Sequence, residues 1–403
     1  MSRRVGVWLL GGKGGVATTV IVGALALERG LCGAHGLLTE TTLCDGVPLP
    51  SWSDLVFGGH DIRSDTVEQS AEQTRSDANT ISAELLDAIR SPLRAIEDDF
   101  RPGFVYSSGA AIDSLAPNAL RPASAAAAVE RTTRDLEEFK TRHGLDHAIV
   151  VNLTSTEPAV PPHPDHGSEE GMTRLVARDD RGHLIASSLY ALAAARARCA
   201  FINFTPSPGA LLPGVAETLS NAGVPFMGSD GKTGETLVKA ALAPLFKYRN
   251  LRVLSWQGYN MLGDRDGQVL ASEENRHTKV QSKDQLLHEY LGYPLHTRVN
   301  IDYVPSLGDL KTAWDFIHFQ GFLGFKMSLQ FTWQGCDSIL AAPLVLDMVR
   351  FASLALTRRE AGPMHHLGVF FKSPFGDHSH DLHAQFHRLS RYLAAAGAPA
   401  TPG

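Results

Sequence analysis

The amino-acid sequence predicts an α/β protein with a doubly wound parallel sheet and a second, smaller domain. Three observations support this class. A short apolar run at residues 5–10 leads directly into a glycine-rich turn and then into an Ala/Leu-rich segment, which is a strand–turn–helix order. Apolar runs and helical patterns continue to alternate as far as residue 249, as they do in parallel sheets. After that point apolar and polar residues alternate, which indicates a second sheet of more antiparallel character.

The composition restricts the classes of protein to consider. The chain has 403 residues, of which 43% are hydrophobic, so it is long enough for two or three domains. Its formal net charge of −6 argues against nucleic acid or an anionic membrane as a partner. The 4 cysteines lie far apart without metal-finger spacing, which favours a reducing compartment. The apolar run at residues 5–10 is too short for a secretory signal or a membrane span, so we expect a cytoplasmic protein.

Local patterns predict the elements of the first part of the chain. The run at residues 5–10 shows no polar alternation, which is typical of a strand buried on both faces, and the helix after it is expected to end at Gly30. The apolar run at residues 36–40 predicts a second strand that ends on the acidic Glu40. The remaining pattern predicts helices and strands in alternation, with helices in 64–100, 123–143, 184–199 and 233–246 and strands at 148–153, 200–204 and 224–227.

The second part of the chain differs in pattern. It predicts three strands, at residues 251–256, 296–304 and 327–333. The apolar run at 338–356 predicts a long buried helix, and residues 367–371 predict a buried strand that returns to the first sheet. The expected division is residues 1–231 for the first domain, 232–337 for an inserted domain and 338–403 for the return.

The turn after the first strand has a G-x-G-x-x-A pattern of small residues: Gly12, Gly14, Gly15, Val16 and Ala17. Glycine permits a tight turn and lets a pyrophosphate approach the backbone N–H groups at the positive end of the next helix. The sequence therefore predicts a dinucleotide site, with Lys13 either near the phosphates or simply solvated. Glu40 is the candidate acceptor for the ribose hydroxyls, although it lies farther from the glycines than the usual ~20 residues.

Two segments place small polar groups directly after predicted parallel strands, at residues 152–158 and 203–209. Ligands bind at the carboxyl ends of the strands in open α/β sheets, so these segments predict a cleft, with ordinary turn chemistry as the alternative. The glycine- and hydroxyl-rich turn at 228–236 is suited to holding a phosphate on N–H groups and hydroxyls. Its acidic residues Asp230 and Glu235 could instead cap the following helix.

Four lysines add a further signal. Lys279 and Lys283 are four residues apart, which on a helix places two ammonium groups on one face at a cost of roughly 0.2–0.5 kcal/mol. A bound phosphate would reverse that cost. Lys311 follows a turn, and Lys372 directly follows the apolar run 367–371. The usual explanation of a single lysine is a surface charge, and for each one taken separately that alternative stays open.

Taken together, the ordered motifs resemble the myo-inositol-phosphate synthase family, in its shorter archaeal and bacterial form. The resemblance covers nearly the whole chain and is weak only at residues 64–147. The segments that carry it are VWLLG at 7–11, GVATT at 15–19, FGGHDIR at 57–63, STEP at 155–158, NFTPSPG at 203–209, GKTGETLVK at 231–239, YNMLGDRDG at 259–267, SKD at 282–284, KTAWD at 311–315, AAPL at 341–344 and FFKSP at 370–374.

This resemblance implies an isomerase of the inositol-3-phosphate synthase type that binds NAD tightly and recycles it. The C5 hydroxyl of open-chain glucose 6-phosphate is oxidised, C6 is deprotonated and attacks the C1 aldehyde, and the ring ketone is reduced again. Each step develops negative charge on an oxygen, which a preorganised ammonium group stabilises by several kcal/mol. The resemblance also implies an NAD-binding domain of the Rossmann type, an inserted α+β domain for catalysis and tetramerisation, and a homotetramer.

Carried over residue by residue, the resemblance assigns the catalytic groups to Lys279, Lys283, Lys311, Lys372, Asp266 and Asp337. It implies a cofactor site that comprises Gly12, Gly14, Gly15, Val16, Ala17, Glu40, Thr154, Ser155, Thr205 and Asp230. The residues expected near the sugar and its phosphate are Thr233, Gly234, Glu235, Asn260, Leu262 and Asp264. We expect Lys279 and Lys372 at the redox and aldol oxygens, with Lys283 and Lys311 nearer the phosphate and the C1 oxygen.

The sequence leaves alternatives open. The same lysines and cofactor would serve a synthase that closes a five-membered carbocycle from fructose 6-phosphate for carbocyclic nucleosides. A non-catalytic NAD-binding regulator and a net dehydrogenase that releases NADH are two others. The family is divided between users of divalent and of monovalent cations, and no His/carboxylate cluster recognisable in the sequence decides the metal.

Overall fold

Two sheets organise the protein. The computed structural model describes residues 4–116, 119–263, 287, 290–376 and 379–397, and the structural statements below refer to these residues. The larger sheet has seven parallel strands in the order β11-β6-β5-β4-β1-β2-β3. Its strands are β1 Val5–Leu10, β2 Leu55–Asp61, β3 Phe100–Pro102, β4 His147–Asn152, β5 Ala200–Asn203, β6 Pro225–Gly228 and β11 Gly362–Pro363.

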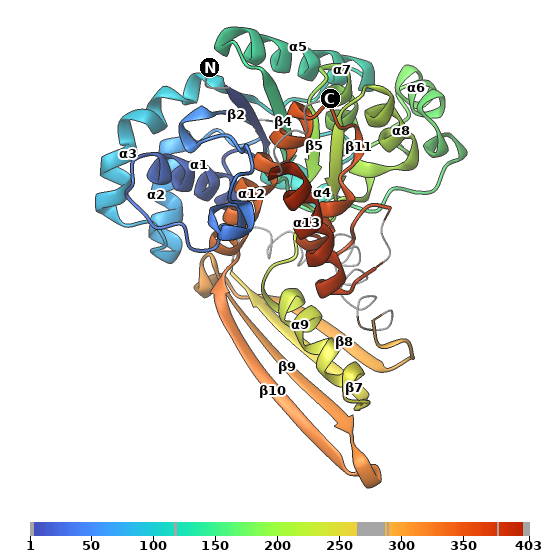
Figure 1. The fold of residues 1–403 in the computed structure, drawn as a ribbon. Coiled ribbons are helices and arrows are strands. Elements are labelled where there is room, and N and C mark those ends of the chain that lie inside the picture. Colours follow the sequence, from blue (N-terminus) through green and yellow to red (C-terminus); the bar gives the residue numbers. More distant parts are fainter. Residues whose placement is uncertain (1–3, 117–118, 264–286, 288–289, 377–378, 398–403) are drawn as a thin grey trace, which may run out of the picture.

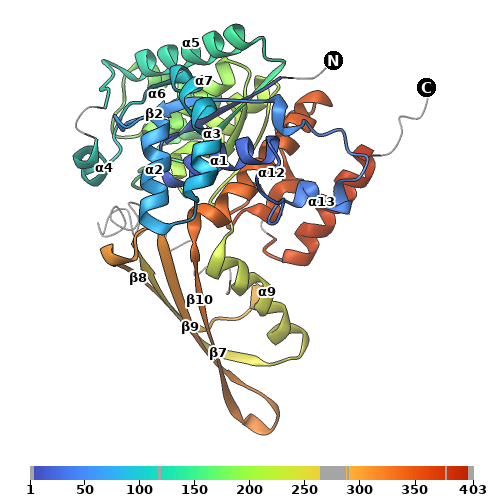
Figure 2. The ribbon, with the colours of Figure 1, turned by 90° about the vertical axis from the view of Figure 1, so that its left-hand side faces the viewer.

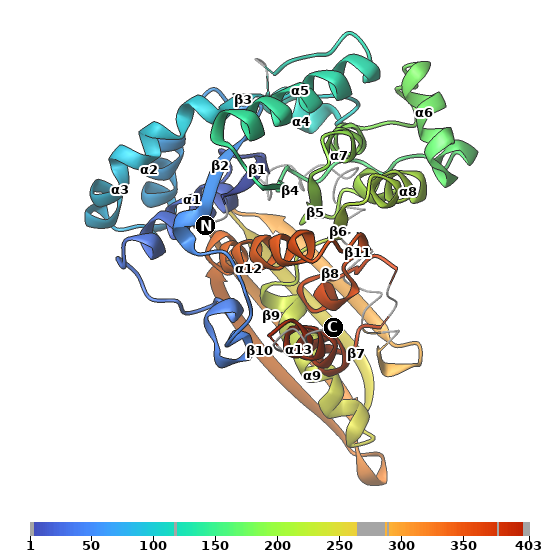
Figure 3. The ribbon, with the colours of Figure 1, turned by 45° about the horizontal axis from the view of Figure 1, so that its top comes forward.

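Helices cover both faces of the larger sheet (Figure 3). The central strand β1 is continuously apolar because both of its faces are buried. Val5, Val7 and Leu9 belong to one core, and Trp8 and Leu10 belong to the other. One layer contains α1 Gly15–Glu28, α2 Val67–Ala78, α3 Ala83–Ala95, α12 Asp337–Thr357 and α13 Leu382–Gly397. The other contains α5 Ala125–His143, α6 Glu169–Ala177, α7 Ala186–Arg196 and α8 Pro213–Asn221, and a short helix, α4, spans Ala110–Leu115. Within the first layer α1, α2 and α3 pack on one another (Figure 2).

The smaller sheet projects away from the larger one, and the hairpin between β9 and β10 forms its far end (Figure 1). Its strands, in the order β10-β9-β7-β8, are β7 Arg252–Leu262, β8 His296–Tyr303, β9 Leu310–Gln320 and β10 Lys326–Cys336. Strand β7 pairs parallel with β8 and antiparallel with β9, so the sheet is mixed. Helix α9, Gly234–Tyr248, packs on one face through Phe246 against Trp256 and Phe319.

The predicted fold class is confirmed, with a doubly wound parallel sheet and a separate smaller sheet. Strand β9 was not predicted, because its polarity is unusual. The face of β9 that is covered carries Lys311 and Asp315 beside small or apolar residues, whereas the outer face carries Trp314 and Phe316. The strand therefore lacks the apolar-inside, polar-outside alternation that identifies a half-buried strand.

Two predicted strands are wrong. Residues 36–40 contain a 3-10 helix, Leu38–Glu40, because the carboxylate of Asp347 on α12 accepts the backbone N–H groups of Leu38 at 2.7 Å and of Thr39 at 3.0 Å. The second strand of the sheet is instead β2. Residues 367–371 also lie largely in a 3-10 helix, His365–Phe370, after which only Phe371 forms a bridge to Gly231.

Helix α12 is long and apolar enough to cross a membrane, and among the described helices it alone has this property. It packs against α1 and β4, and 72% of its most apolar window is buried inside the protein. Its hydrophobicity is therefore that of a core helix.

Candidate functional site

A cavity of about 490 Å³ lies at the carboxyl edge of the larger sheet. The glycine turn after β1 and the segments that follow β2, β4, β5 and β6 form one wall. The opposite wall comes from the smaller sheet and the start of α12. This is the edge at which open α/β sheets bind ligands.

The glycine turn has the geometry of an anion site. Gly14, Gly15, Val16 and Ala17 line the cavity, where α1 begins without a side-chain cap and without an acidic residue in its first turn. The backbone N–H groups and the helix dipole at this end can therefore receive a phosphate. Gly12 has a packing role, because a Cβ on it would lie 2.4 Å from the ring of Phe100.

Two of the charged residues expected near the nucleotide, Lys13 and Glu40, lie outside the cavity lining. The Nζ atom of Lys13 is 2.8 Å from Oε1 of Glu97, and Oε1 of Glu40 is 2.5 Å from Nη1 of Arg350. The acid at the end of the observed second strand is Asp61, which lines the cavity and accepts the backbone N–H of Lys13 at 2.7 Å. Sequence reasoning missed Asp61 because a long excursion, residues 29–54, separates α1 from β2.

The polar segments after β4 and β5 meet, as predicted. Nδ2 of Asn152 donates to Oδ1 of Asn203 at 3.0 Å, and the segments bring Thr154, Ser155 and Thr205 to the cavity. Glu157 of the first segment is fully buried in the cavity wall and accepts the backbone N–H of Ser187 at 3.3 Å. Burial raises the pKa of the Glu157 carboxyl to about 7. A group with such a pKa at a cavity is a candidate functional residue, and the sequence motifs did not point to it.

Lys372 and Asp230 form an ion pair at the cavity. The distance from Nζ to Oδ1 is 2.7 Å, and each side chain is less than a tenth exposed. Two backbone segments that run antiparallel hold the pair: the N–H of Lys372 donates to the carbonyl of Asp230, and Ser229 and Ser373 exchange two hydrogen bonds. Asp230 has a φ of 63°, a left-handed conformation within this tight turn. The structure therefore brings Lys372 and Asp230, which were both expected at the ligand site, together at one cavity.

A second ion pair lies across the cavity. Nζ of Lys311 on β9 is 3.1 Å from Oδ2 of Asp337, the first residue of α12. Thr233 lines the cavity at the start of α9, and a Cβ placed on Gly234 would lie 3.9 Å from Nζ of Lys311 and from Oδ1 of Asp337. The amino end of α9 and an ammonium group thus face the same space.

Three of the remaining expected residues lie outside the cavity lining: Glu235 on α9, and Asn260 and Leu262 on β7 of the smaller sheet. Glu235 forms a buried cluster with Lys239 and Asp315. Leu262 packs in an apolar cluster. Asn260 is completely buried, and its side-chain amide makes no hydrogen bond with the described part of the chain. Lys279, Lys283, Asp264 and Asp266 lie outside the described residues.

Comparison with known proteins decides the family. The sequence profile described as "Myo-inositol-1-phosphate synthase" matches residues 5–394. The inositol-3-phosphate synthase 1 of Bacteroides thetaiotaomicron is 32% identical over 97% of this chain and 95% of its own length. The chain belongs to the myo-inositol-1-phosphate synthase family.

Solved structures agree with this family at the level of the fold. The inositol-3-phosphate synthase of Caenorhabditis elegans is 22% identical and has a TM-score of 0.87 over 99% of this chain and 86% of its own. A myo-inositol-1-phosphate synthase-related protein of Thermotoga maritima, also 22% identical, has a TM-score of 0.77 over 97% of this chain and 99% of its own. The fold of this synthase-family chain is therefore the NAD-binding Rossmann type with the additional sheet.

One more acidic group lines the cavity of this family member. Asp309 lies beside the glycine turn, where a Cβ on Gly15 would be 3.7 Å from its Oδ1 atom. It accepts a hydrogen bond from the hydroxyl of Ser338 and contacts the thiol of Cys336 at 2.9 Å. Burial raises the pKa of Asp309. Sequence reasoning had no signal for Asp309, because only the folded chain brings it to the turn.

Proposed function

We propose that this chain catalyses the NAD-dependent cyclisation of glucose 6-phosphate to a myo-inositol phosphate. The observation that carries the proposal is the convergence on one cavity of the uncapped glycine turn, the Lys372–Asp230 pair and the Lys311–Asp337 pair. A dinucleotide on the turn and a phosphorylated sugar between the two ammonium groups would share one water-poor space, in which fixed charges act strongly on developing charge.

The phosphate end of the sugar is assigned to the start of α9. No side chain caps the first N–H groups of α9, and Thr233, Gly234 and the ammonium group of Lys311 face the same space. Phosphates bind at such helix ends because the N–H groups and the helix dipole both favour negative charge. The ammonium group of Lys311 pairs with Asp337, and it can turn from that carboxylate toward a bound phosphate.

The reacting end of the sugar is assigned to Lys372. Bound NAD supplies the reversible hydride acceptor of the reaction. The ammonium group of Lys372, oriented by Asp230, can donate a hydrogen bond to the substrate oxygen that becomes negative. By resemblance, Lys279, Lys283 and Asp266 complete the proposed catalytic set, with Lys279 and Lys372 acting at the redox and aldol oxygens and Lys283 nearer the phosphate.

Two further expectations belong to this proposal. The buried amide of Asn260, without a hydrogen bond to the described residues, supports a polar ligand near the sugar-binding face of β7, since an unsatisfied buried amide costs about 1–3 kcal/mol. By resemblance, Leu262 and Asp264 are proposed to line the sugar, and Glu235 is proposed to lie near its phosphate. Glu40 pairs with Arg350. Its proposed contribution to the cofactor site is therefore to support the fold around the nucleotide.

A cation is a further component that family resemblance leaves open. The oxygen donors beside the glycine turn are Asp309, Asp337 and Ser338, which suit Mg²⁺ or a monovalent cation better than a soft metal. A cation held there would neutralise the carboxylates next to a bound pyrophosphate.

The assembly proposed for the chain is a homotetramer in which residues 232–337 form the catalytic and assembly domain. The support is the outer face of the smaller sheet, where Trp314 is 40% exposed and stacks along β9 with Phe316 and His318. The tip of the β9–β10 hairpin exposes Phe322 and Leu323 almost fully. Such apolar surface is typical of a surface that contacts another protein.

Paired assays of the purified protein test the activity. Incubation with NAD and glucose 6-phosphate is expected to give a phosphatase-released, periodate-sensitive cyclitol with no accumulation of NADH. A parallel reaction with fructose 6-phosphate separates the six-membered from the five-membered product. Stoichiometric NADH would indicate a net dehydrogenase, and no product from either sugar, with NAD bound, would indicate a non-catalytic NAD-binding protein.

A further inference from the structure

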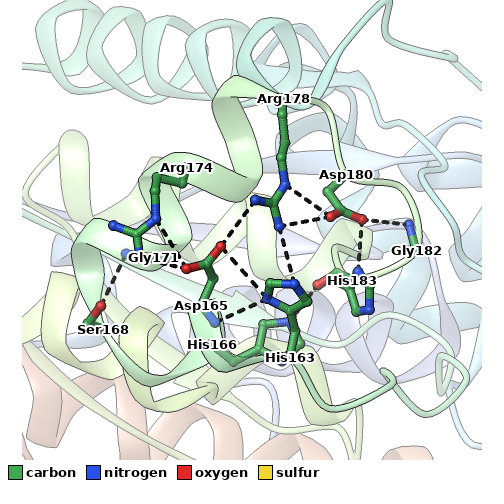
Figure 4. Close-up of polar contacts among 10 residues, drawn as sticks. All are labelled: His163, Asp165, His166, Ser168, Gly171, Arg174, Arg178, Asp180, Gly182 and His183. Atoms are coloured by element: carbon green, nitrogen blue, oxygen red, sulfur yellow. Dashed lines mark hydrogen bonds and ion pairs between the residues drawn. The ribbon is translucent and has the colours of Figure 1, made fainter.

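A second polar cluster lies away from the cavity, in the long segment that joins β4 to α7. Within the part of the chain that the structure describes, one set of histidine, cysteine and acidic side chains brings three ligand atoms within 4.8 Å of one another: His163, Asp180 and His183. Figure 4 shows these side chains close together, and they come from the segments that precede and follow α6 in the sequence. None of them lines the cavity.

The chemistry of the cluster is that of a cation site. Two imidazoles and one carboxylate are the ligand types that Zn²⁺ and similar ions bind, and each side chain is between a fifth and a third exposed, so an ion can reach it. Nδ1 of His183 is 2.9 Å from Oδ1 of Asp180. The ligand atoms of a tetrahedral zinc site lie roughly 3.4 Å apart, given Zn–N bonds of about 2.1 Å. Small side-chain rotations would close the cluster to that size.

The guanidinium group of Arg178 lies among these side chains (Figure 4). It is 3.1 Å from Oδ2 of Asp180 and 3.2 Å from Oδ2 of Asp165. Its Nη2 atom is also 3.3 Å from Nε2 of His163. Arg178 is nearly half exposed, so it can leave the cluster for solvent.

His163 is poorly matched to that arginine. Its Nδ1 accepts the backbone N–H of Asp165 at 3.1 Å, and its Nε2 faces the N–H donors of Arg178. A neutral imidazole has only one acceptor nitrogen, so it cannot accept from both donors. A metal ion on Nε2 would use the lone pair of that nitrogen and fix the ring proton on Nδ1, so that Nδ1 would donate instead of accepting the backbone N–H of Asp165. Oδ2 of Asp165 lies 3.8 Å from Nδ1 of His163. Once Arg178 has left, this oxygen could accept the Nδ1–H, as in carboxylate–histidine–metal arrangements.

We propose that His163, Asp180 and His183 bind one divalent transition-metal ion of the zinc class, which displaces Arg178 and leaves one coordination position to water. The site joins the two ends of the segment that encloses η5, Pro164–Gly167, and α6. That segment starts beside Glu157 and ends beside Ser187, and both of these residues line the cavity and bond to each other. The bound ion would therefore stabilise a wall of the cavity without touching its ligands.

Titration of Zn²⁺ and Co²⁺ into chelator-treated protein, without sugar, tests the site. Calorimetry is expected to show one high-affinity equivalent with proton release, and bound Co²⁺ is expected to show the absorption of a four-coordinate ion. His163→Ala and His183→Ala are expected to weaken binding at least tenfold and to abolish the Zn²⁺-dependent rise in Tm. His383→Ala removes an exposed histidine on α13 and is the matched control.

A variant of Arg178 provides a test of the metal site that does not depend on damage to the fold. Arg178→Gln removes the competing cation and retains the ligands, so it is expected to tighten Zn²⁺ binding several-fold, whereas Asp165→Asn is expected to weaken it about tenfold. Binding that is equal in the wild type and in the two histidine variants would overturn the proposal. Unchanged or weaker binding in Arg178→Gln would also overturn it.

Discussion

Two buried lysine–carboxylate groups differ in what surrounds them. Lys372 and Asp230 lie at the edge of the cavity, whereas Lys239 lies between α9 and the smaller sheet, 2.5 Å from Oε1 of Glu235 and 3.5 Å from Oδ1 of Asp315. Both lysines are less than a tenth exposed. The first group can reach a ligand, and the second is enclosed outside the cavity lining.

The enclosed group shows how a buried charge is tolerated without a catalytic role. A Cβ on Gly258 of β7 would lie 2.7 Å from Oε1 of Glu235, so glycine provides the room for the cluster. Burial lowers the pKa of Lys239, but the two carboxylates more than offset this, and the net shift is upward. The comparison teaches that burial in an ion pair does not by itself make a lysine a candidate for catalysis, whereas access to a cavity does.

The largest effect is expected from Lys239→Met. Removal of the ammonium group leaves two carboxylates buried together, so the free energy of unfolding should fall by about 3–5 kcal/mol. Denaturant titration at fixed protein concentration measures this. Lys326→Met, at an exposed lysine on β10, is the control and should change stability by less than about 0.5 kcal/mol. A loss below 1 kcal/mol for Lys239→Met would contradict the enclosed ion cluster.

The counterpart at the cavity is Lys372→Met. Here the main expected effect is on turnover, which should fall about 10²–10³-fold, because one preorganised donor to a developing oxyanion is lost. The rate of cyclitol formation from glucose 6-phosphate measures it, with Lys326→Met again as the control. Turnover within threefold of the wild type would remove Lys372 from the catalytic set.

A smaller effect concerns the pH dependence of stability that arises at the cavity wall. The folded-state pKa of Glu157, about 7, lies above its usual 4.5, so the folded protein retains a proton that the unfolded chain loses as pH rises between these values. Stability should therefore fall as pH rises from 5 to 7, by up to about 1.4 kcal/mol per pH unit. Glu157→Gln should flatten this part of the curve, as measured by denaturant titration at several pH values. An unchanged slope would show that Glu157 titrates normally.

The smallest effect is expected from Glu40→Gln. Because Glu40 pairs with Arg350 at a partly exposed site outside the cavity, the Kd for NAD should change less than about twofold and stability by less than about 1 kcal/mol. Asp61→Asn changes a carboxylate inside the cavity and should weaken NAD binding at least fivefold. Calorimetric titration of NAD compares them, and a larger effect at Glu40 would reverse the assignment.

Much of the fold was predictable because it depends on local pattern. The continuous apolar run at residues 5–10, the turn after it and the periodicity of helices such as α5 and α12 follow from residues close in the chain. The strand predicted at residues 36–40 failed because its stabilising partner, Asp347, lies on a helix near the other end of the chain.

The sequence by itself determined the buried strands β1, β4, β5 and β6, the glycine turn after β1 and, through ordered motifs, the family. Tertiary structure alone decided which lysine faces a cavity. Asp230 and Lys372 are separated by 142 positions, and only the antiparallel contact of their backbone segments brings them to 2.7 Å. Lys239 and Glu235 share one helix turn, yet they face the enclosed side of the smaller sheet. The reason is physical: a side chain's solvation and partners depend on how elements pack, which residue type and spacing do not specify.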